Sequence, residues 1–341
     1  MKRTFLAITA AAGAFVFNAG AWDYDGHHAI NELALASLPG NFGIELTPAL
    51  KGRIEFLAGE PDRWRNVSDL PLKHFNGPDH YIDLEDLKLF GLTPGTLPIM
   101  RYDFAADIAR ARAAHPEKFP AIDPAKDDDH TRELSGFLPW AITEYYEKLK
   151  SDFTCLKVFK QYGGTPEEIA NARADIVYVM GVMGHYVGDG SQPLHTTMHH
   201  HGWVGDNPKG YTTKTTFHAW IDGGYFKKIG GIKVEALVGK IQPATRIANA
   251  GEPDGMFRDV VAYLVEQNKF VEPLYQMEKD GQLNGDGDKG LEGRPFLEGQ
   301  LVKAGQKLGN LWLTAWLESS DGDPYLEKQL QERASANAET K

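Results

Sequence analysis

Apolar residues recur along most of this chain at the three- and four-residue spacing of an amphipathic helix. The pattern predicts helices outside the centre of the chain at 28–38, 50–57, 101–114, 136–159, 256–278 and 296–318. No segment shows a convincing alternation of apolar and polar residues with a period of two, which would indicate a strand. The fold class is therefore predicted to be all-α.

A further helix is predicted in the centre of the chain. Thr165 is its expected N-cap, Pro166 lies in its first turn and Glu168 completes a capping box. The segment 176–184 is apolar on every side, which is typical of a helix inside a domain. Long loops are expected between the helices, at 60–79, 86–99, 115–131, 196–217 and 279–295. None has the composition of a flexible linker, so we predict a single mostly helical domain.

Residues 1–21 have the features of a secretory signal peptide. Lys2 and Arg3 precede an apolar stretch, and Ala19-Gly20-Ala21 forms a small-residue cleavage site. The mature chain would begin at Trp22, with a catalytic domain at 22–320 and a polar, solvated tail at 321–341. No later apolar stretch reaches the about 18 residues that span a membrane. We therefore expect a secreted or periplasmic protein with no membrane anchor after cleavage.

Charge and cysteine content narrow the chemistry. The formal net charge of the 341-residue chain is −11, and it is −13 without Lys2 and Arg3. An acidic chain disfavours nucleic-acid binding through a basic face, so a phosphodiester substrate would have to be attracted by local cations such as bound metals. Cys155 is the single cysteine, which excludes an intrachain disulfide and a thiolate zinc site. Histidine, carboxylate and main-chain groups remain as metal ligands.

Two blocks between residues 185 and 222 carry such groups. The first is His185-x3-Asp189-x5-His195 and the second is His218-x3-Asp222. Residues four apart lie on one face of a helix, so an imidazole and a carboxylate can converge on one cation. A core histidine with a capping aspartate is the alternative for a single pair, but two pairs plus His195 favour metal binding.

Four more positions can supply donors: Trp22, His27, Asp62 and His80. Cleavage before Trp22 would leave a free amino group, whose nitrogen can chelate a metal together with the carbonyl oxygen of the same residue. With the first five residues this makes nine donor positions. They suffice for three zinc sites that share a bridging carboxylate and leave positions open for water.

At this point the chain resembles a known family. Trp-x4-His at the mature N-terminus, an Asp followed 18 residues later by a His, and the two His/Asp blocks are similar to the zinc-dependent phospholipase C and single-strand-specific nuclease superfamily. Its nuclease branch contains the fungal nucleases called S-one and P-one. The resemblance covers most of the mature chain and implies an all-α fold with three Zn²⁺ ions at the bottom of a cleft.

The resemblance also implies a role for each residue. Asp62, His80, His185 and Asp189 would bind one zinc, and Trp22, His27 and the bridging Asp189 its close neighbour; His195, His218 and Asp222 would hold the third. Asp62 would orient a zinc-activated water, and Arg65 would face the scissile phosphate. Tyr81 and Asp83 match positions that stack on and hydrogen-bond a nucleobase, although an aromatic residue at 81 could equally pack in the core.

The chain departs from the family in two respects. Cys155 cannot reproduce the disulfides of the eukaryotic enzymes, which indicates a bacterial-type variant, and Gly223 stands where the fungal enzymes have a polar base-binding residue. Base preference is therefore open. Three other motifs are interpreted as non-functional or left open. His199-His200-His201 is expected to be an exposed run and Asn284-Gly-Asp286-Gly-Asp288 a turn, while glycosylation at Asn66 depends on the host.

The expected function is hydrolysis of single-stranded DNA and RNA to 5′-phosphorylated nucleotides, with 3′-nucleotidase activity. Nucleic acid or nucleotides would be the substrate, and no stable protein partner is implied. The main alternative is a phospholipase C that acts on lipid head groups; that branch places Glu where this chain has Asp222, and no amphipathic docking stretch is evident. A binding module with purely structural metals is a third hypothesis, which nine donors around an open cleft disfavour.

Overall fold

The computed structural model describes residues 22–339, and its regular secondary structure is helical. Helices make up 66% of the structure, and the described residues form no strand. The predicted all-α class and the single mostly helical domain are therefore confirmed. The signal peptide predicted at 1–21 lies outside the described residues. In the described part, no helix combines the length and the apolar character needed to cross a membrane.

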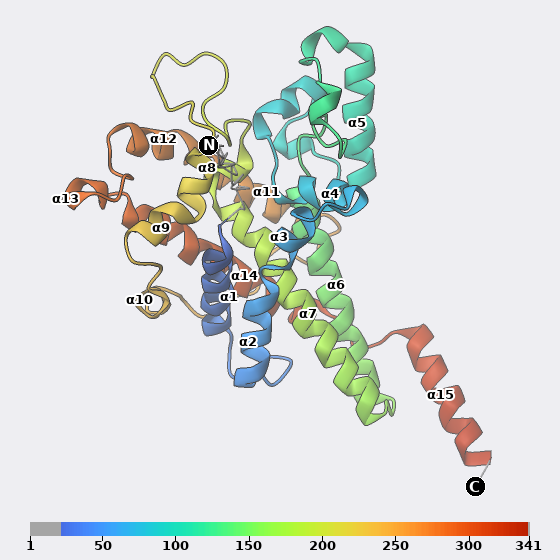
Figure 1. The fold of residues 1–341 in the computed structure, drawn as a ribbon. Helices are drawn as coiled ribbons and strands as arrows, with labels where there is room; N and C mark the ends of the chain where they lie inside the picture. The colour runs from blue at the N-terminus through green and yellow to red at the C-terminus, as the bar shows by residue number, and fades with distance from the viewer. Residues whose placement is uncertain (1–21, 340–341) are drawn as a thin grey trace, which may run out of the picture.

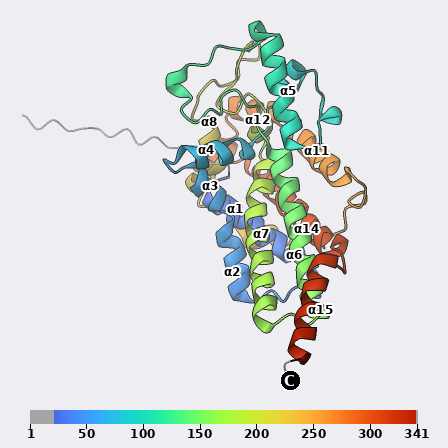
Figure 2. The same ribbon diagram turned by 90° about the vertical axis from the view of Figure 1, so that its right-hand side faces the viewer.

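Five helices form the centre of the molecule: α1 (Tyr24–Ser37), α2 (Pro48–Leu57), α6 (Leu138–Gln161), α7 (Pro166–Ser191) and α14 (Arg294–Glu318). The long helices α6 and α7 run side by side through the molecule (Figures 1 and 2). α14 packs against α1, α6 and α7, while α2 and α1 cover another side of α7. As a result the second half of α7, from Val179 to Ser191, is buried along its whole length.

The predicted start of α7 is confirmed. The Thr165 hydroxyl accepts a hydrogen bond from the Glu168 backbone N–H at 3.2 Å, and the Glu168 carboxylate accepts one from the Thr165 N–H at 2.7 Å. This reciprocal pair satisfies two backbone donors that no carbonyl of the helix can reach. It fixes where the helix begins, and hence which of its residues reach the interior.

Shorter elements surround this centre. They are α3 (Glu60–Arg65), α4 (Leu70–Asn76), η1 (Gly77–His80), η2 (Leu84–Phe90), η3 (Pro94–Thr96), α5 (Arg101–Ala114), η4 (Pro116–Lys118), η5 (Pro124–Lys126), η6 (Pro193–Thr196), α8 (Phe217–Ala219), the π-helical η7 (Trp220–Gly224), α9 (Tyr225–Lys228), α10 (Val234–Val238) and α13 (Gly287–Gly290). The segment 84–131 with α5 lies at one end of the molecule in both views (Figures 1 and 2).

Three expectations about single elements were wrong. The segment 60–79 is not a loop but contains α3, α4 and most of η1, which are too short to show a clear apolar period. The helix expected at 256–278 is two helices, α11 (Gly255–Asn268) and α12 (Val271–Lys279). Phe270, where the chain turns, keeps near-helical angles (φ −91°, ψ −1°), but Pro273 in the first turn of α12 has no N–H to donate to the Lys269 carbonyl, so α11 does not continue through it. Part of the predicted turn at 284–288 belongs to the short helix α13.

The polar tail also contains a helix, which its composition does not predict. α15 (Pro324–Glu339) extends along the end of α6 and α7, away from α5 (Figure 2). Most of its side chains are exposed, as expected for a solvated segment, but Leu330 is buried. The Arg333 guanidinium donates to the Glu168 carboxylate at 2.7 Å and 3.0 Å, which ties α15 to the start of α7.

Candidate metal centre

The buried end of α7 supplies the middle of the candidate site. His185 and Asp189 lie one helical turn apart, both without exposed surface, and the distance from His185 Nε2 to Asp189 Oδ2 is 3.5 Å. The apolar residues before them place this face of α7 in the interior, where an unpaired carboxylate is costly to desolvate. The predicted helical pair is therefore present at the spacing that a shared cation requires.

Three imidazoles surround the Asp189 carboxylate. On one side, Oδ2 lies 2.9 Å from His80 Nδ1 as well as 3.5 Å from His185 Nε2. On the other side, Oδ1 lies 3.4 Å from His27 Nε2. The two oxygens of one carboxylate thus face different histidines. This is the arrangement that a carboxylate bridging two cations would have.

α3 brings Asp62 to the same place. Its Oδ1 lies 3.9 Å from His185 Nε2 and 2.9 Å from Arg65 Nε. The Asp62 and Arg65 side chains are 18% and 17% exposed, whereas His27, His80, His185 and Asp189 are fully buried. Asp62 and Arg65 therefore lie where the buried cluster meets solvent, and a polar ligand could reach them.

A second cluster is formed by His195 from η6, His218 from α8 and Asp222 from η7. His218 Nε2 lies 2.8 Å from His195 Nε2 and 3.2 Å from Asp222 Oδ2. The described residues contain three groups of side chains that could hold a metal ion. Within each group, the ligand atoms lie within 4.8 Å of one another. The groups are His27, Asp62 and His185; His80, His185 and Asp189; and His195, His218 and Asp222.

Hydrogen bonds outside the clusters fix which ring nitrogens face inward. His185 Nδ1 lies 2.7 Å from the Ala58 carbonyl oxygen, and His195 Nδ1 lies 2.6 Å from that of His80. Each of these nitrogens must carry the proton, because a carbonyl oxygen only accepts. The Nε2 atom of each ring is then a lone-pair donor that points into its cluster.

The chemistry of the donor set fits bound cations. His195 Nε2 carries no proton, so it presents a lone pair to the cluster, and His218 Nε2 lies 2.8 Å from it. In the metal-free chain His218 can donate to this lone pair, and both nitrogens are ligand atoms that could bind a cation. Three atoms that face the clusters are buried with no hydrogen-bond partner: His27 Nε2, Asp189 Oδ1 and Asp222 Oδ2. Together these atoms are a ligand set that a hydrogen-bond network alone leaves unsatisfied.

Burial shifts the proton equilibria of these groups in one consistent direction. Loss of solvent lowers the pKa of His27, His80, His185 and His218 well below its usual value, and lowers that of His195 to about 3. It raises the pKa of Asp189 and Asp222 well above the usual value for a carboxyl. The neutral imidazoles are ready to bind metal, and a divalent cation would hold the two aspartates in their charged form.

Trp22 lies next to both clusters. Its indole is fully buried and donates to the Ser191 hydroxyl at 3.0 Å, and the backbone N–H of the next residue, Asp23, donates to the Asp222 carbonyl at 3.1 Å. Trp22, where the mature chain is predicted to begin, therefore lies at the candidate site. Whether Trp22 carries a free amino group depends on processing of residues 1–21, which the structure does not describe.

The predicted base-binding residues, Tyr81 and Asp83, directly follow His80. The Tyr81 hydroxyl donates to the Leu134 carbonyl at 3.2 Å, and the Tyr81 ring is only partly buried. Asp83 is 8% exposed, and burial raises the pKa of its carboxyl. The Nδ1 atom of His200 lies 3.7 Å from Asp83 Oδ1.

Gln192 was not identified from the sequence. Its side-chain amide donates to Asp222 Oδ1 at 2.7 Å, and its side-chain oxygen accepts from the Leu194 N–H at 2.8 Å. Fixed at both ends, Gln192 holds Asp222 so that Oδ2 faces His218. Its position in the gap between Asp189 and His195 is the one signal that could have drawn attention to it.

The histidine run is not uniformly exposed, contrary to expectation. The His199 ring stacks on Trp203 with centroids 3.9 Å apart, His200 is half-buried and His201 is exposed. The run folds back over the second cluster, so the His201 and His218 rings lie 5.3 Å apart. Sequence alone could not reveal this, because the contacts join segments that are distant along the chain.

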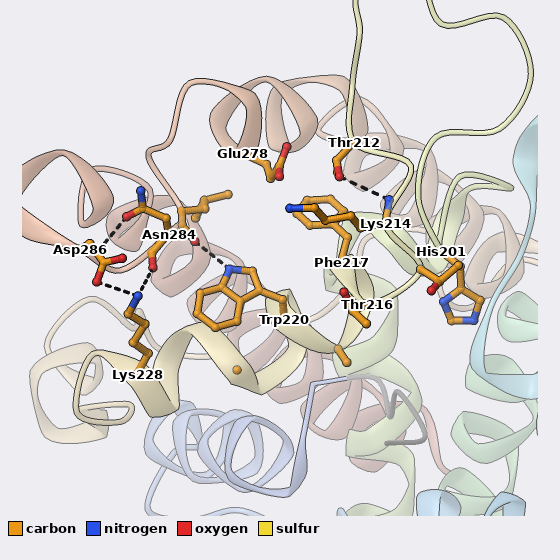
Figure 3. Close-up of a pocket in the computed structure, with 14 residues that line it drawn as sticks. His201, Thr212, Lys214, Thr216, Phe217, Trp220, Lys228, Glu278, Asn284 and Asp286 are labelled. Carbon is orange, nitrogen blue, oxygen red and sulfur yellow. Dashed lines mark hydrogen bonds and ion pairs between the residues drawn. The ribbon is translucent and has the colours of Figure 1, made fainter. Parts of the chain in front are cut away.

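A cavity of about 900 Å³ opens beside the second cluster (Figure 3). Phe217 and Ala219, the neighbours of His218, line it together with Trp220 and Leu283. His201 lies at one edge, and Lys228, paired with Asp286 at 2.7 Å, lies at the opposite edge. The two neighbours of His218 in the sequence thus border the cavity.

Comparison with known proteins does not assign the chain. It matches no protein-family model, and no curated protein is significantly similar to it.

Proposed function

We propose that this protein is a zinc-dependent phosphodiesterase that hydrolyses single-stranded DNA and RNA to 5′-phosphorylated nucleotides and has 3′-nucleotidase activity. The observation that carries the proposal is the Asp189 carboxylate, whose two oxygens face different histidines within a fully buried cluster. A second His/Asp cluster adjoins it, and an arginine stands at its exposed edge.

Three ions would be held by the nine residues that the sequence pattern identifies. His80, His185, Asp62 and Asp189 would hold one; His27, Asp189 and the amino and carbonyl groups of Trp22 a second; and His195, His218 and Asp222 the third. The donors are nitrogens and carboxylate oxygens without thiolates, a set that suits Zn²⁺. When bound, such ions supply a water of lowered pKa and neutralise charge on a phosphoryl group.

The chain's own residues position the substrate. Arg65 presents a guanidinium at the exposed edge, where it would bind oxygens of the scissile phosphate and stabilise the charge that develops on them. Asp62, next to it, would accept a hydrogen bond from the attacking water and so orient it. Because Asp62 also holds Arg65 Nε at 2.9 Å, the two groups are kept in fixed relation to each other.

The test uses the chain that begins at Trp22, loaded with zinc. We expect single-stranded DNA and RNA to yield nucleotides with 5′-phosphates, 3′-AMP to release phosphate, and duplex DNA to react more slowly. The same preparation is assayed on lecithin. Absence of any nucleic-acid cleavage between pH 5 and 8, with three zinc ions bound, would overturn the proposal.

A matched pair of variants links activity to the cluster. Asp189→Asn keeps the shape of the side chain but removes the charge between the histidines, so we expect loss of bound zinc and a fall in kcat of at least about 1000-fold. Asp103→Asn, at an exposed position of α5, is the control and should behave as the wild type. Equal zinc content in both variants would contradict the proposed bridging role.

One observation favours the alternative, a phospholipase C with the same metals. α4 follows the helix that carries Asp62 and Arg65, and it exposes Leu70 by 41% and Phe75 by 62%. Exposed apolar side chains beside an active site suit an enzyme that works at a lipid surface. Diglyceride release from lecithin without nucleotide release would establish this alternative.

A further inference from the structure

His200 lies at the edge of the second cluster, between it and the predicted base-binding segment. Its ring centroid is 6.4 Å from that of His218 and 6.1 Å from that of Tyr81. The His200 side chain is 34% exposed, whereas His195 and His218 are buried. A substrate that reaches from the candidate metal ligands toward Tyr81 would therefore pass this ring.

The segment that carries His200 is held from several sides. The Glu85 carboxylate accepts from the Thr197 hydroxyl at 2.7 Å and from the Met198 N–H at 3.1 Å. The adjacent His199 ring stacks on Trp203, and the Tyr275 hydroxyl donates to the His199 carbonyl. Because its neighbours are anchored, the His200 backbone has a fixed position, as a binding residue requires.

The orientation of the His200 ring is also determined. Nδ1 lies 3.1 Å from the Thr197 carbonyl oxygen and 3.7 Å from Asp83 Oδ1, so this nitrogen carries a proton. Nε2 has no hydrogen-bond partner among the described residues. The pattern repeats that of His185 and His195, whose Nδ1 atoms are bonded to carbonyls while Nε2 is presented to a ligand.

Asp83 lies beside the His200 ring. Its Oδ1 is buried without a hydrogen-bond partner and lies 3.7 Å from His200 Nδ1. A buried carboxylate next to the Nδ1 of a histidine favours one ring orientation. The group that meets the substrate at this place is then the half-exposed imidazole.

We propose that His200 is a substrate-binding residue that contacts the nucleoside part of the substrate through its ring face and Nε2, and that Asp83 is the residue that positions it. The inference rests on the proposed function, since it names the part of a nucleotide substrate that this edge recognises. The phosphate would be bound by the metal groups and Arg65.

The test compares binding of 5′-AMP with binding of inorganic phosphate, measured by calorimetry on the zinc-loaded chain that begins at Trp22. His200→Ala should weaken 5′-AMP binding at least tenfold and phosphate binding less than threefold. His200→Gln, whose amide can reach the place of Nε2, should recover part of the loss. Zinc content is measured for every variant, and the exposed His115→Ala is the control.

A double-mutant cycle tests the role of Asp83. Asp83→Asn should weaken 5′-AMP binding by less than His200→Ala does, and the double variant should bind like His200→Ala alone. Additive losses would show that Asp83 acts independently and would overturn the positioning role. Equal losses for 5′-AMP and phosphate would show that His200 only supports the metal cluster, and an unchanged affinity for 5′-AMP would also overturn the proposal.

The two proposals fail in distinguishable ways. If the wild type cleaves nucleic acid but His200→Ala binds 5′-AMP normally, the role of His200 is wrong and the proposed function stands. If the wild type binds zinc but cleaves no nucleic acid and binds 5′-AMP no better than phosphate, both proposals are overturned.

Discussion

At the scale of single residues, the site depends on which hydrogen bond each side chain makes away from the cluster. His185 and His195 each bind a backbone carbonyl through Nδ1, and this sets the direction of the other nitrogen. Asp222 is set in the same way by Gln192. Such outer partners orient the metal ligands, so we expect their removal to lower metal affinity.

Gln192→Leu tests this dependence at the third metal group. The variant removes the donor to Asp222 Oδ1 while keeping a side chain of similar size, so the buried carboxylate loses both a hydrogen bond and its orientation. We expect affinity for one of three zinc ions to fall by about 10–100-fold, with the other two retained. Zinc content after dialysis at graded free zinc measures this. Gln276→Leu, at a partly exposed position of α12, is the control; equal loss of all three ions would contradict the assignment.

At the scale of helices, the site depends on how closely α1 and α2 approach α7. The glycines at 181, 184 and 188 lie on one face of α7, and a Cβ atom at each would come within 3 Å of Leu57, Asn31 and His27 respectively. Because the helices lie this close, the Asn31 side-chain amide donates to the Ile54 and Gly181 carbonyls at 2.9 Å and 3.1 Å. The same approach brings His27 of α1 to Asp189 of α7.

Gly184→Ala should therefore be strongly destabilising. Its Cβ would lie 1.7 Å from Asn31 Oδ1, and moving this fully buried side chain breaks its hydrogen bonds to two helices. We expect the free energy of unfolding to fall by about 2–4 kcal/mol. The control is Gly299→Ala in α14, where no atom lies within 4 Å and alanine should stabilise by up to about 1 kcal/mol. Denaturant unfolding of both variants measures the difference; an unchanged midpoint for Gly184→Ala would refute the packing argument.

The contact of α6 with α7 includes a half-buried carboxyl, that of Asp152, which should make stability depend on pH. Burial, and then the nearby Asp175 carboxylate, raise the pKa of Asp152 to about 6, and Asp152 Oδ2 has no hydrogen-bond partner. A carboxyl whose pKa is higher in the folded chain favours folding when protonated. Its contribution is present below about pH 4 and is lost as the pH rises through about 6.

Asp152→Asn should remove this dependence. Relative to the wild type, the variant should gain stability at pH 7, on the order of 1 kcal/mol after allowance for screening by solvent, and gain little at pH 4. Thermal unfolding at the two pH values measures the effect. Glu147→Gln, on the exposed face of the same helix, is the control. An equal gain at both pH values would indicate a cause other than titration.

At the scale of the whole molecule, the metal groups join segments that are far apart along the chain. His27 from α1, Asp62 from α3 and His185 from α7 form one group, and His195 and His218 come from either side of a long irregular segment. Without cations, the buried Asp189 and Asp222 carboxylates face neutral imidazoles. Ions bound at these groups should therefore contribute to folding.

Chelation should lower the melting temperature at pH 7, and added Zn²⁺ should restore it. A ligand that binds only the folded chain stabilises it by about 4 kcal/mol at 1000 times its Kd, so Tm should rise with free zinc concentration. Mg²⁺ should not substitute, since nitrogen-rich sites bind it weakly. Thermal scans with and without chelator measure the change. A Tm that does not respond to zinc would show that the three groups do not bind the metal.

Local patterns were sufficient for the features that one segment determines. The helical class, the capped start of α7 and the His185–Asp189 pair each follow from residues within one or two turns of one another. Helix periodicity and capping act over short distances, so the order of residues carries them. The break between α11 and α12 was missed although Pro273 marks it, because the apolar period continues across the proline.

The tertiary structure decided everything that joins distant segments. It set the two oxygens of Asp189 against different histidines, paired Asp62 with Arg65 at the exposed edge, and brought His200 to Asp83. These contacts depend on how closely helices pack, which is governed by the shapes of many side chains at once. The sequence by itself therefore determined which residues could bind metal, whereas packing decided which atoms face one another.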